Sequence, residues 1–357
     1  MSHTAPWPMM IGAAAQHRPR EKHVAPFDYE RMRVAGVEWV RLGIRAPFTD
    51  ESMSATTAAF QEQEREIERI AAHGLKVMGF SPHPGGDPDI GGHYPAWGGP
   101  VGSQEYFDHY EAVCAWLADR FKGVVEAWQI ANELNRPFWA GGLSPEQAVT
   151  YLQHGGKGVR AGHPSALIGF NMAGFDKIAM EMYATLLGED DDFDYIGCDG
   201  YMPPDEWPEK LAMLKSISDK PIIVQEFGYA SAGITLTPEQ TRAHPFKTAH
   251  DRCRWLGWPH SWEGHGHTLK EQAEYITACM SHFLAEPRVA GVIVWRWDDA
   301  PHCWLCGRPS DVCPGTGKWG LVDEHGQPKP SLEAFRGGAS LLRAREKGKE
   351  ANGSLPR

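Results

Sequence analysis

The chain has 357 residues, of which 42% are hydrophobic and 23% charged, and its formal net charge is -11. This is an ordinary composition for a soluble protein, and the length suits one α/β barrel with insertions, large enough to need no crosslinks. The acidic balance and the absence of a Lys/Arg run exclude the basic patch of a nucleic-acid-binding protein, and no stretch approaches the ~20 apolar residues that span a bilayer. We therefore expect neither a nucleic-acid partner nor a membrane partner.

Eight apolar, strand-like runs follow one another along the chain. They cover residues 9–15, 37–44, 75–80, 124–131, 166–171, 195–199, 221–226 and 289–297. Helix-like stretches alternate with them, near residues 27–35, 57–73, 103–121, 144–161, 175–187, 206–217, 269–286 and 331–344. Ser144 followed by Pro145 is typical of a helix start. Eight consecutive strand–helix units predict an α/β protein with a single (β/α)8 barrel (a TIM barrel) over residues 1–345, and a disordered polar tail over 346–357.

Three connections are unusually long, namely residues 81–102, 229–268 and 298–330. They follow the third, seventh and eighth strands, so they lie at the C-terminal face of the predicted barrel, where active sites of this fold are built. The first contains Tyr94 and Trp97, and the second contains Trp255, Trp258 and Trp262. Since tryptophan offers a flat apolar face with one N–H donor, these loops suit either packing or sugar binding.

Two glutamates end buried strands. Glu133 follows the fourth strand and Glu226 ends the seventh. Strand ends four and seven face each other across a barrel mouth, so the two carboxyl groups can converge. Retaining glycoside hydrolysis needs such a pair, with one acid to protonate the departing oxygen and one carboxylate to attack the anomeric carbon. The alternative reading is that each glutamate only forms an ion pair with an arginine.

The motifs around these glutamates resemble glycoside hydrolase clan A, whose members are retaining barrel enzymes that include cellulases, mannanases, β-galactosidases and β-xylosidases. The resemblance lies in Trp-Gln-Ile-Ala-Asn-Glu ending at Glu133 and Ile-Val-Gln-Glu-Phe-Gly around Glu226. It implies that Glu133 is the acid/base, that Glu226 is the nucleophile and that Asn132 binds the sugar 2-hydroxyl. It spans the second strand to the last helix and leaves the family within the clan open.

Other positions agree with the same clan. Arg41 matches the arginine that steadies the nucleophile, and Tyr201 matches a tyrosine near it. Trp295, with Trp297 two residues on, matches the tryptophan that forms the floor of the sugar site, and His83 is a candidate to line that site. The plain alternatives are an ordinary ion pair for Arg41, for which Arg45 could compete, simple packing for Tyr201 and Trp295, and a turn cap for His83.

Seven cysteines, an odd number, indicate a reducing compartment rather than a disulfide framework. The N-terminal residues lack a basic region followed by an apolar run of signal-peptide length, so we expect a cytoplasmic protein. Cys303, Cys306 and Cys313 lie close together in the sequence. Their ligand types suit a structural zinc ion, and one disulfide with a spare thiol or three unlinked cysteines are the alternatives.

The sequence therefore predicts a retaining glycosidase that acts on a β-linked carbohydrate and needs no cofactor for catalysis. Two other classes stay open. One is a metal-dependent sugar-converting barrel, with Asp199 and His83 as further ligands, and the other is a carbohydrate-binding barrel without activity. Sugar identity, linkage, exo or endo action and oligomeric state do not follow from the sequence.

Overall fold

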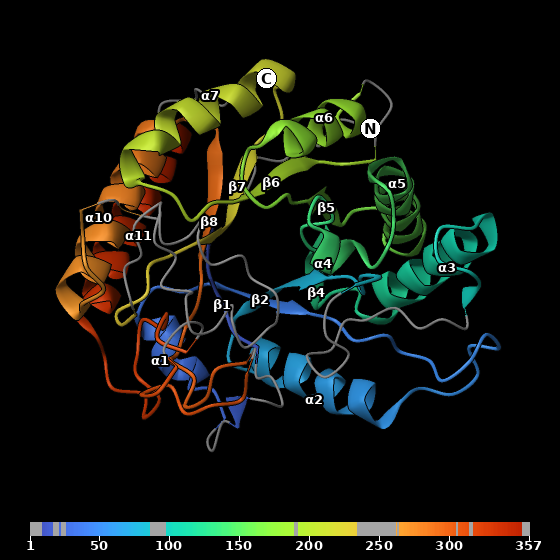
Figure 1. Ribbon diagram of the computed structural model, residues 1–357, viewed down its shortest axis with the longest axis horizontal. Coiled ribbons are helices and arrows are strands. Elements are labelled where there is room, and N and C mark those ends of the chain that lie inside the picture. Colours follow the sequence, from blue (N-terminus) through green and yellow to red (C-terminus); the bar gives the residue numbers. More distant parts are fainter. Residues whose placement is uncertain are drawn as a thin grey trace, which may run out of the picture.

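The computed structural model describes residues 9–16, 21–22, 26–85, 98–188, 192–233, 262, 264–304, 306–313 and 317–351. Eight parallel strands form a closed barrel (Figure 1) in the order β1-β2-β3-β4-β5-β6-β7-β8. Strand β8 closes it by pairing with β1, where Met10 stands opposite Gly291. The predicted (β/α)8 barrel is thus confirmed. Within the described residues, no helix is both long enough and apolar enough to cross a membrane.

The strands are short, as is usual for a barrel of this type. They are β1 Met10–Ala14, β2 Trp39–Gly43, β3 Lys76–Phe80, β4 Val125–Ile130, β5 Leu167–Phe170, β6 Tyr195–Asp199, β7 Ile222–Phe227 and β8 Val289–Val294. The sequence placed all eight, mostly one or two residues too long at an end. Apolar runs continue past the point where ladder pairing stops, so hydrophobicity alone overestimates strand length.

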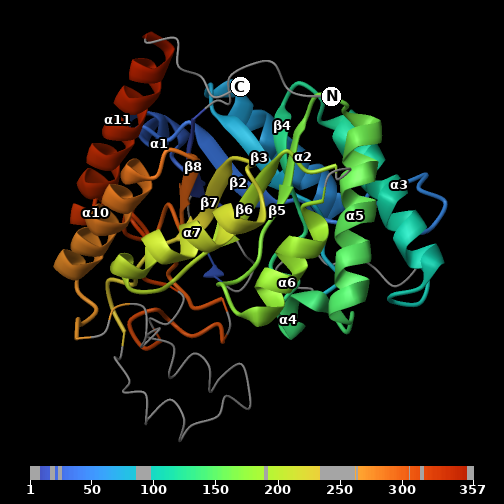
Figure 2. The ribbon, with the colours of Figure 1, turned by 90° about the horizontal axis from the view of Figure 1, so that it is seen from above.

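Helices surround the strands, and Figure 2 shows α10 beside α11 and α3 beside α5. They are α1 Tyr29–Val34, α2 Ala58–Ala72, α3 Gln104–Arg120, α5 Pro145–Gly162, α6 Lys177–Leu186, α7 Trp207–Ile217, α10 Leu269–Ala285 and α11 Pro330–Ala351. The predicted start at Ser144 is a complete capping box, in which the Ser144 side chain accepts from Gln147 N and the Gln147 side chain accepts from Ser144 N.

Three parts of the helical structure differ from the prediction. The short helix α4, Pro137–Ala140, and the 3-10 turn η4, Pro204–Glu206, were not expected. Helix α11 continues to Ala351, so the tail expected from residue 346 is helical up to that point, and residues 352–357 lie outside the described part. A polar composition does not stop a helix when the residues are good helix formers, as Glu, Lys and Ala are here.

The barrel interior is layered, and the layering leads to the site. One buried cluster contains one residue from every strand except β5, and Leu167 of β5 packs against it. Its members are Met10, Trp39, Met78, Ala127, Tyr195, Ile223 and Ile293. Two residues further along β2, β4 and β7 stand Arg41, Gln129 and Gln225, all buried. Because side chains alternate along a strand, these polar residues point inward too and form the layer below the mouth.

Candidate active site

Glu226 lies at the end of β7, and each of its two carboxyl oxygens accepts a hydrogen bond. Arg41 Nη1 donates to Oε1 at 2.7 Å, and the Tyr201 hydroxyl donates to Oε2 at 2.5 Å. Arg41 is 1% exposed and Glu226 is 7% exposed. An ion pair and a second hydrogen bond, both sheltered from water, fix the direction of this carboxyl group.

Glu133 stands on an unusual piece of backbone just after β4. Both Ala131 and Glu133 have left-handed conformations, with φ of 54° and 49°. These conformations are costly for residues with a Cβ, and local hydrogen bonds hold them. Ala131 N donates to Ser81 Oγ at 2.8 Å, and Glu133 N donates to Asn171 Oδ1 at 2.9 Å. Strain of this kind gathers at functional sites, and here it turns the Glu133 side chain into the mouth.

Three carboxyl groups meet there rather than two. One carboxylate oxygen from each of Glu133, Asp199 and Glu226 lies within 4.8 Å of the others. A side-chain hydrogen bond links Glu133 to Asp199. The separation of the two strand-end glutamates fits the ~5 Å spacing of a retaining pair and not the ~6.5–9.5 Å of an inverting pair.

The electrostatics of the two partner carboxyls follow from this crowding. Burial, and after it the negative charge of Glu226, raise the pKa of Glu133 to about 7, although the hydrogen bond from Asp199 and the charge of Arg41 oppose the rise. Burial, followed by the charges of Glu226 and Glu133, holds the pKa of Asp199 well above its usual range. Near neutral pH these two carboxyl groups therefore hold protons beside Glu226, which is paired with Arg41.

A network of hydrogen bonds through Arg41 and three side-chain amides connects Glu226 with Asp199. Arg41 Nη2 donates to Asn132 Oδ1 at 2.8 Å, and Arg41 Nε donates to Gln129 Oε1 at 2.7 Å. Asn171 Nδ2 donates to Asn132 Oδ1 at 3.1 Å and to Asp199 Oδ2 at 2.5 Å. Gln129 Nε2 also donates to Asn132 Oδ1, at 3.1 Å. With its oxygen held by three donors, Asn132 is locked in one orientation, which leaves its amide N–H groups to point elsewhere.

The structure brings together most of the residues that the sequence singled out. Arg41, and not Arg45, contacts Glu226. Tyr201 contacts the same carboxylate and has Trp319 edge-on at 5.3 Å between ring centroids. Trp295 is partly exposed just past β8, and its peptide bond to Arg296 is cis.

Trp297 and His83 are both buried. Trp297 is 2% exposed and belongs to the hydrophobic core, so its ring is covered and we do not carry a sugar-binding role over to it. His83 is buried, with Nδ1 2.8 Å from Gly85 O and its ring edge-on to Trp139 at 5.0 Å. The turn-capping contact is thus present.

Sequence reasoning missed three residues that support the glutamates, namely Gln129, Asn171 and Asp199. Gln129 was part of a quoted motif, and Asp199 was considered only as a metal ligand. A signal did exist, since each is a polar residue inside or just after an apolar strand. Such a residue is costly to bury without a partner, which makes it a candidate for a polar network.

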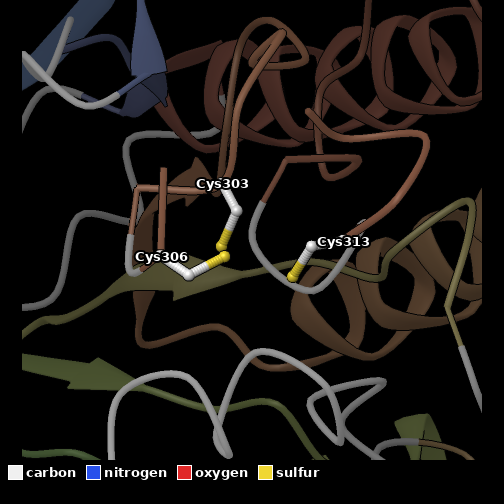
Figure 3. A group of neighbouring side chains, drawn as sticks. All are labelled: Cys303, Cys306 and Cys313. Carbon is white, nitrogen blue, oxygen red and sulfur yellow. The ribbon is translucent and has the colours of Figure 1, made fainter. Parts of the chain in front are cut away.

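The three clustered cysteines lie in the connection after β8, and their sulfur atoms lie within 4.8 Å of one another (Figure 3). Cys303 and Cys306 are carried by one tight turn, in which Gly307 N donates to Cys303 O at 2.7 Å and Gly307 has φ of 68°. Cys313 arrives from the next turn. Trp255 and Trp258, and Tyr94 and Trp97, lie outside the described residues.

Known proteins resemble this chain in structure. No family model and no curated protein matches the sequence. Xylanase 10B from Thermotoga petrophila, solved with xylobiose, has 18% identity and a TM-score of 0.63, covering 97% of this chain and 99% of its own. An exo-beta-1,4-mannosidase from Opitutaceae bacterium strain TAV5 has 17% identity and a TM-score of 0.63, covering 94% and 60%.

A family 39 glycoside hydrolase from Bacteroides cellulosilyticus WH2 has 15% identity and a TM-score of 0.61, covering 94% of this chain and 64% of its own. The structural neighbours are thus clan A glycoside hydrolases, the clan that the motifs resemble. At these identities the likeness shows the fold alone.

Proposed function

We propose that this protein is a retaining glycoside hydrolase that cleaves a β-linked glycoside by double displacement. The observation that carries the proposal is the pair Glu133 and Glu226, whose carboxyl oxygens lie within 4.8 Å at two facing strand ends. Their surroundings differ in the way the reaction requires, because Glu226 is paired with Arg41 while burial raises the pKa of Glu133 to about 7. One group is ready to attack and the other holds a proton.

In the first step, a carboxylate oxygen of Glu226 attacks the anomeric carbon and the bond to the leaving oxygen breaks. Glu133 transfers its proton to that oxygen, so the leaving group departs as an alcohol and Glu133 becomes a carboxylate. The hydroxyl of Tyr201 and the guanidinium of Arg41 keep the attacking carboxylate aimed. We assign the contact with the sugar 2-hydroxyl to Asn132, whose orientation Arg41 and Asn171 fix.

In the second step, Glu133 takes a proton from water as the water oxygen attacks the glycosyl-enzyme. The bond to Glu226 breaks, the sugar leaves with its original configuration, and Glu133 is protonated again. We assign the floor of the sugar site to Trp295 and a lining position to His83. The carbohydrate ligand of a structural neighbour, xylobiose, supports a β-linked sugar as the substrate class.

A screen of the wild-type protein and Glu226→Ala against aryl β-glycosides and short β-linked oligosaccharides tests the proposal. Turnover by the wild type alone is expected, and the sugar that is cleaved defines the substrate. Equal turnover by both proteins, or binding of a sugar without turnover in any member of the panel, would contradict it. The second result would favour a carbohydrate-binding barrel.

The metal-dependent alternative has a weaker basis. Glu133, Asp199 and Glu226 are carboxylates within ligand distance of one another. However, Arg41 already forms an ion pair with Glu226, and its positive charge opposes a cation bound to the same carboxylate. Turnover that a chelator abolishes and added Mg²⁺ or Mn²⁺ restores would revive this alternative.

For the cysteine cluster we propose a structural zinc ion bound by Cys303, Cys306 and Cys313. Zinc bonds to thiolates at ~2.3 Å, which places tetrahedral sulfur ligands roughly 3.8 Å apart, and the three sulfur atoms lie within 4.8 Å. The tight turn at Gly307 presents the first two thiols to one point. The described residues supply three ligands, so a fourth has to come from elsewhere.

Metal analysis of protein purified without added zinc tests this site. We expect about one zinc ion per chain in the wild type, loss of most of it in Cys306→Ala, and no loss in the control Cys279→Ala, a buried cysteine of α10. Absence of metal together with an intact mass 2 Da below the reduced chain would show a disulfide instead.

A further inference from the structure

Asp199 is a buried carboxyl group that has no role in the two reaction steps described above. It ends β6, is 1% exposed, and has an oxygen within 4.8 Å of an oxygen of each strand-end glutamate. Its Oδ2 accepts from Asn171 Nδ2 at 2.5 Å. Its Oδ1 is buried and receives no hydrogen bond from a described donor. A carboxylate would need donors at both oxygens, whereas a carboxylic acid needs an acceptor for one O–H.

The acceptor is close by. The carboxyl group of Glu133 forms a hydrogen bond with that of Asp199. Two carboxyl groups can share such a bond only if one of them carries a proton. Asn171 holds the pair together, because it donates to Asp199 and accepts from the backbone N–H of Glu133 at 2.9 Å.

The charges around Asp199 point to the same state. The side chains that act on it or respond to it are Glu133, Glu226, Arg41, Tyr201, Tyr183 and Cys198. Burial raises the pKa of both tyrosines and of Cys198, so all three stay neutral. The positive charge of Arg41 is matched by Glu226, and that of Arg136 by Asp176. The two arginines that act on Glu133 are thus each paired with another carboxylate.

We propose that Asp199 is a positioning residue that keeps its own proton throughout the reaction and donates a hydrogen bond from it to Glu133. This inference rests on the proposed glycosidase function and adds a third carboxyl group to its machinery. When Glu133 gives up its proton to the departing oxygen, the O–H of Asp199 stabilises the carboxylate that forms. When Glu133 takes a proton from water, the same bond returns to its starting state, so Asp199 gains and loses nothing.

The sign of a pH shift tests the proposal. The alkaline limb of kcat/KM reports loss of the proton from the acid/base. If Asp199 is a protonated donor, Asp199→Ala removes stabilisation of the Glu133 carboxylate, so the limb moves to higher pH, by about one unit. Asp199→Asn keeps a neutral N–H donor and leaves the limb near its wild-type position. If Asp199 is ionised instead, both variants remove a negative charge, and the limb moves to lower pH in both.

A matched control separates this effect from loss of structure. Tyr183→Phe removes a buried hydroxyl that donates to Gly197 O at 2.7 Å, and it acts in the same region without touching the reacting groups. We expect it to lower stability and to leave the alkaline limb in place. A limb that moves equally in Tyr183→Phe and Asp199→Ala would overturn the proposal.

A measurement that needs no turnover keeps this proposal distinct from the function. In protein labelled with ¹³C at the aspartate carboxyl groups, the signal absent from Asp199→Asn identifies Asp199. We expect that signal to remain at the shift of a carboxylic acid at neutral pH. Titration near the usual aspartate value of 3.8 would overturn the proposal even if the enzyme is active. Conversely, a protonated Asp199 in a protein that cleaves no glycoside would contradict the proposed glycosidase function but not the protonation state inferred for Asp199.

Discussion

The two strand-end glutamates have different hydrogen-bonding partners on the two sides of the barrel mouth. On the β7 side, Glu226 has a donor on each oxygen, one of them the buried Arg41 guanidinium. On the β4 side, Glu133 stands on strained backbone and forms a hydrogen bond with a second carboxyl group, Asp199. The residue type is the same on both sides, so the difference lies in what each strand end packs against.

This difference gives each glutamate its chemical role. The guanidinium of Arg41 and the hydroxyl of Tyr201 hold the Glu226 carboxyl group in place for attack as a nucleophile. Burial and the negative charge of Glu226 raise the pKa of Glu133 to about 7, so Glu133 keeps its proton at lower pH. An acid and a nucleophile thus arise from two glutamates a few ångströms apart because their partners differ.

The largest effect is expected on the β7 side. Replacing Glu226 with Ala removes the group that forms the covalent intermediate, so turnover of every substrate should fall by at least about 10⁴-fold. Steady-state kinetics with the best aryl glycoside measures this loss, and circular dichroism checks that the fold is kept. A loss below about tenfold would mean that Glu226 is not the nucleophile.

On the β4 side the expected loss depends on the substrate. Glu133→Ala should slow cleavage of an oligosaccharide by roughly 10²–10⁴-fold, because its leaving alcohol needs a proton. An activated aryl glycoside needs little acid assistance, so its first step should be affected far less. Comparing kcat/KM for the two substrate types measures the contrast, and equal losses would remove the acid role from Glu133.

Tyr201 offers a smaller test of the grip on Glu226. Tyr201→Phe keeps the ring against Trp319 and removes the hydroxyl that donates to the carboxylate. One hydrogen bond to a charged group contributes about 1.5–3 kcal/mol, so kcat should fall by roughly 10- to 100-fold. An unchanged kcat with a lower melting temperature would mean that Tyr201 serves packing alone.

The smallest effect concerns stability against pH on the β4 side. The folded state raises the pKa of Glu133 from 4.5 to about 7, so its proton is bound more tightly than in the unfolded chain. That contribution to stability is complete below pH 4.5 and is lost as the pH rises through about 7. Glu133→Gln cannot ionise, so relative to the wild type its melting temperature should rise by about 2–5 °C between pH 5 and pH 8. A difference that is the same at both pH values would contradict the raised pKa.

Much of this arrangement was readable from the sequence because it follows chain order. Hydrophobic runs that alternate with amphipathic stretches fix a barrel, and a glutamate after the fourth strand must then face one at the end of the seventh. The helix start at Ser144 was readable for the same reason, since capping depends on neighbours in the chain.

Other features depend on contacts that no local pattern contains. The bond from Asn171 to Asp199 joins two strand ends 28 residues apart, and the left-handed backbone at Glu133 depends on that same asparagine. Trp297 shows the opposite error, because a tryptophan two residues from a mouth position was read as a sugar contact and lies in the core. The alternation of side chains along a strand suggested that Trp297 points the same way as Trp295. However, β8 ends at Val294, so this alternation does not extend to Trp297.

Capture of the covalent intermediate tests the central claim most directly. The wild-type protein would be incubated with 2-deoxy-2-fluoro β-glycosyl fluorides of the common sugars, and its intact mass and peptides measured. We predict a mass increase of one fluoroglycosyl unit on the peptide that contains Glu226. Hydrolysis of a β-glycoside that gives the inverted anomer as its first product, with no adduct, would contradict the account.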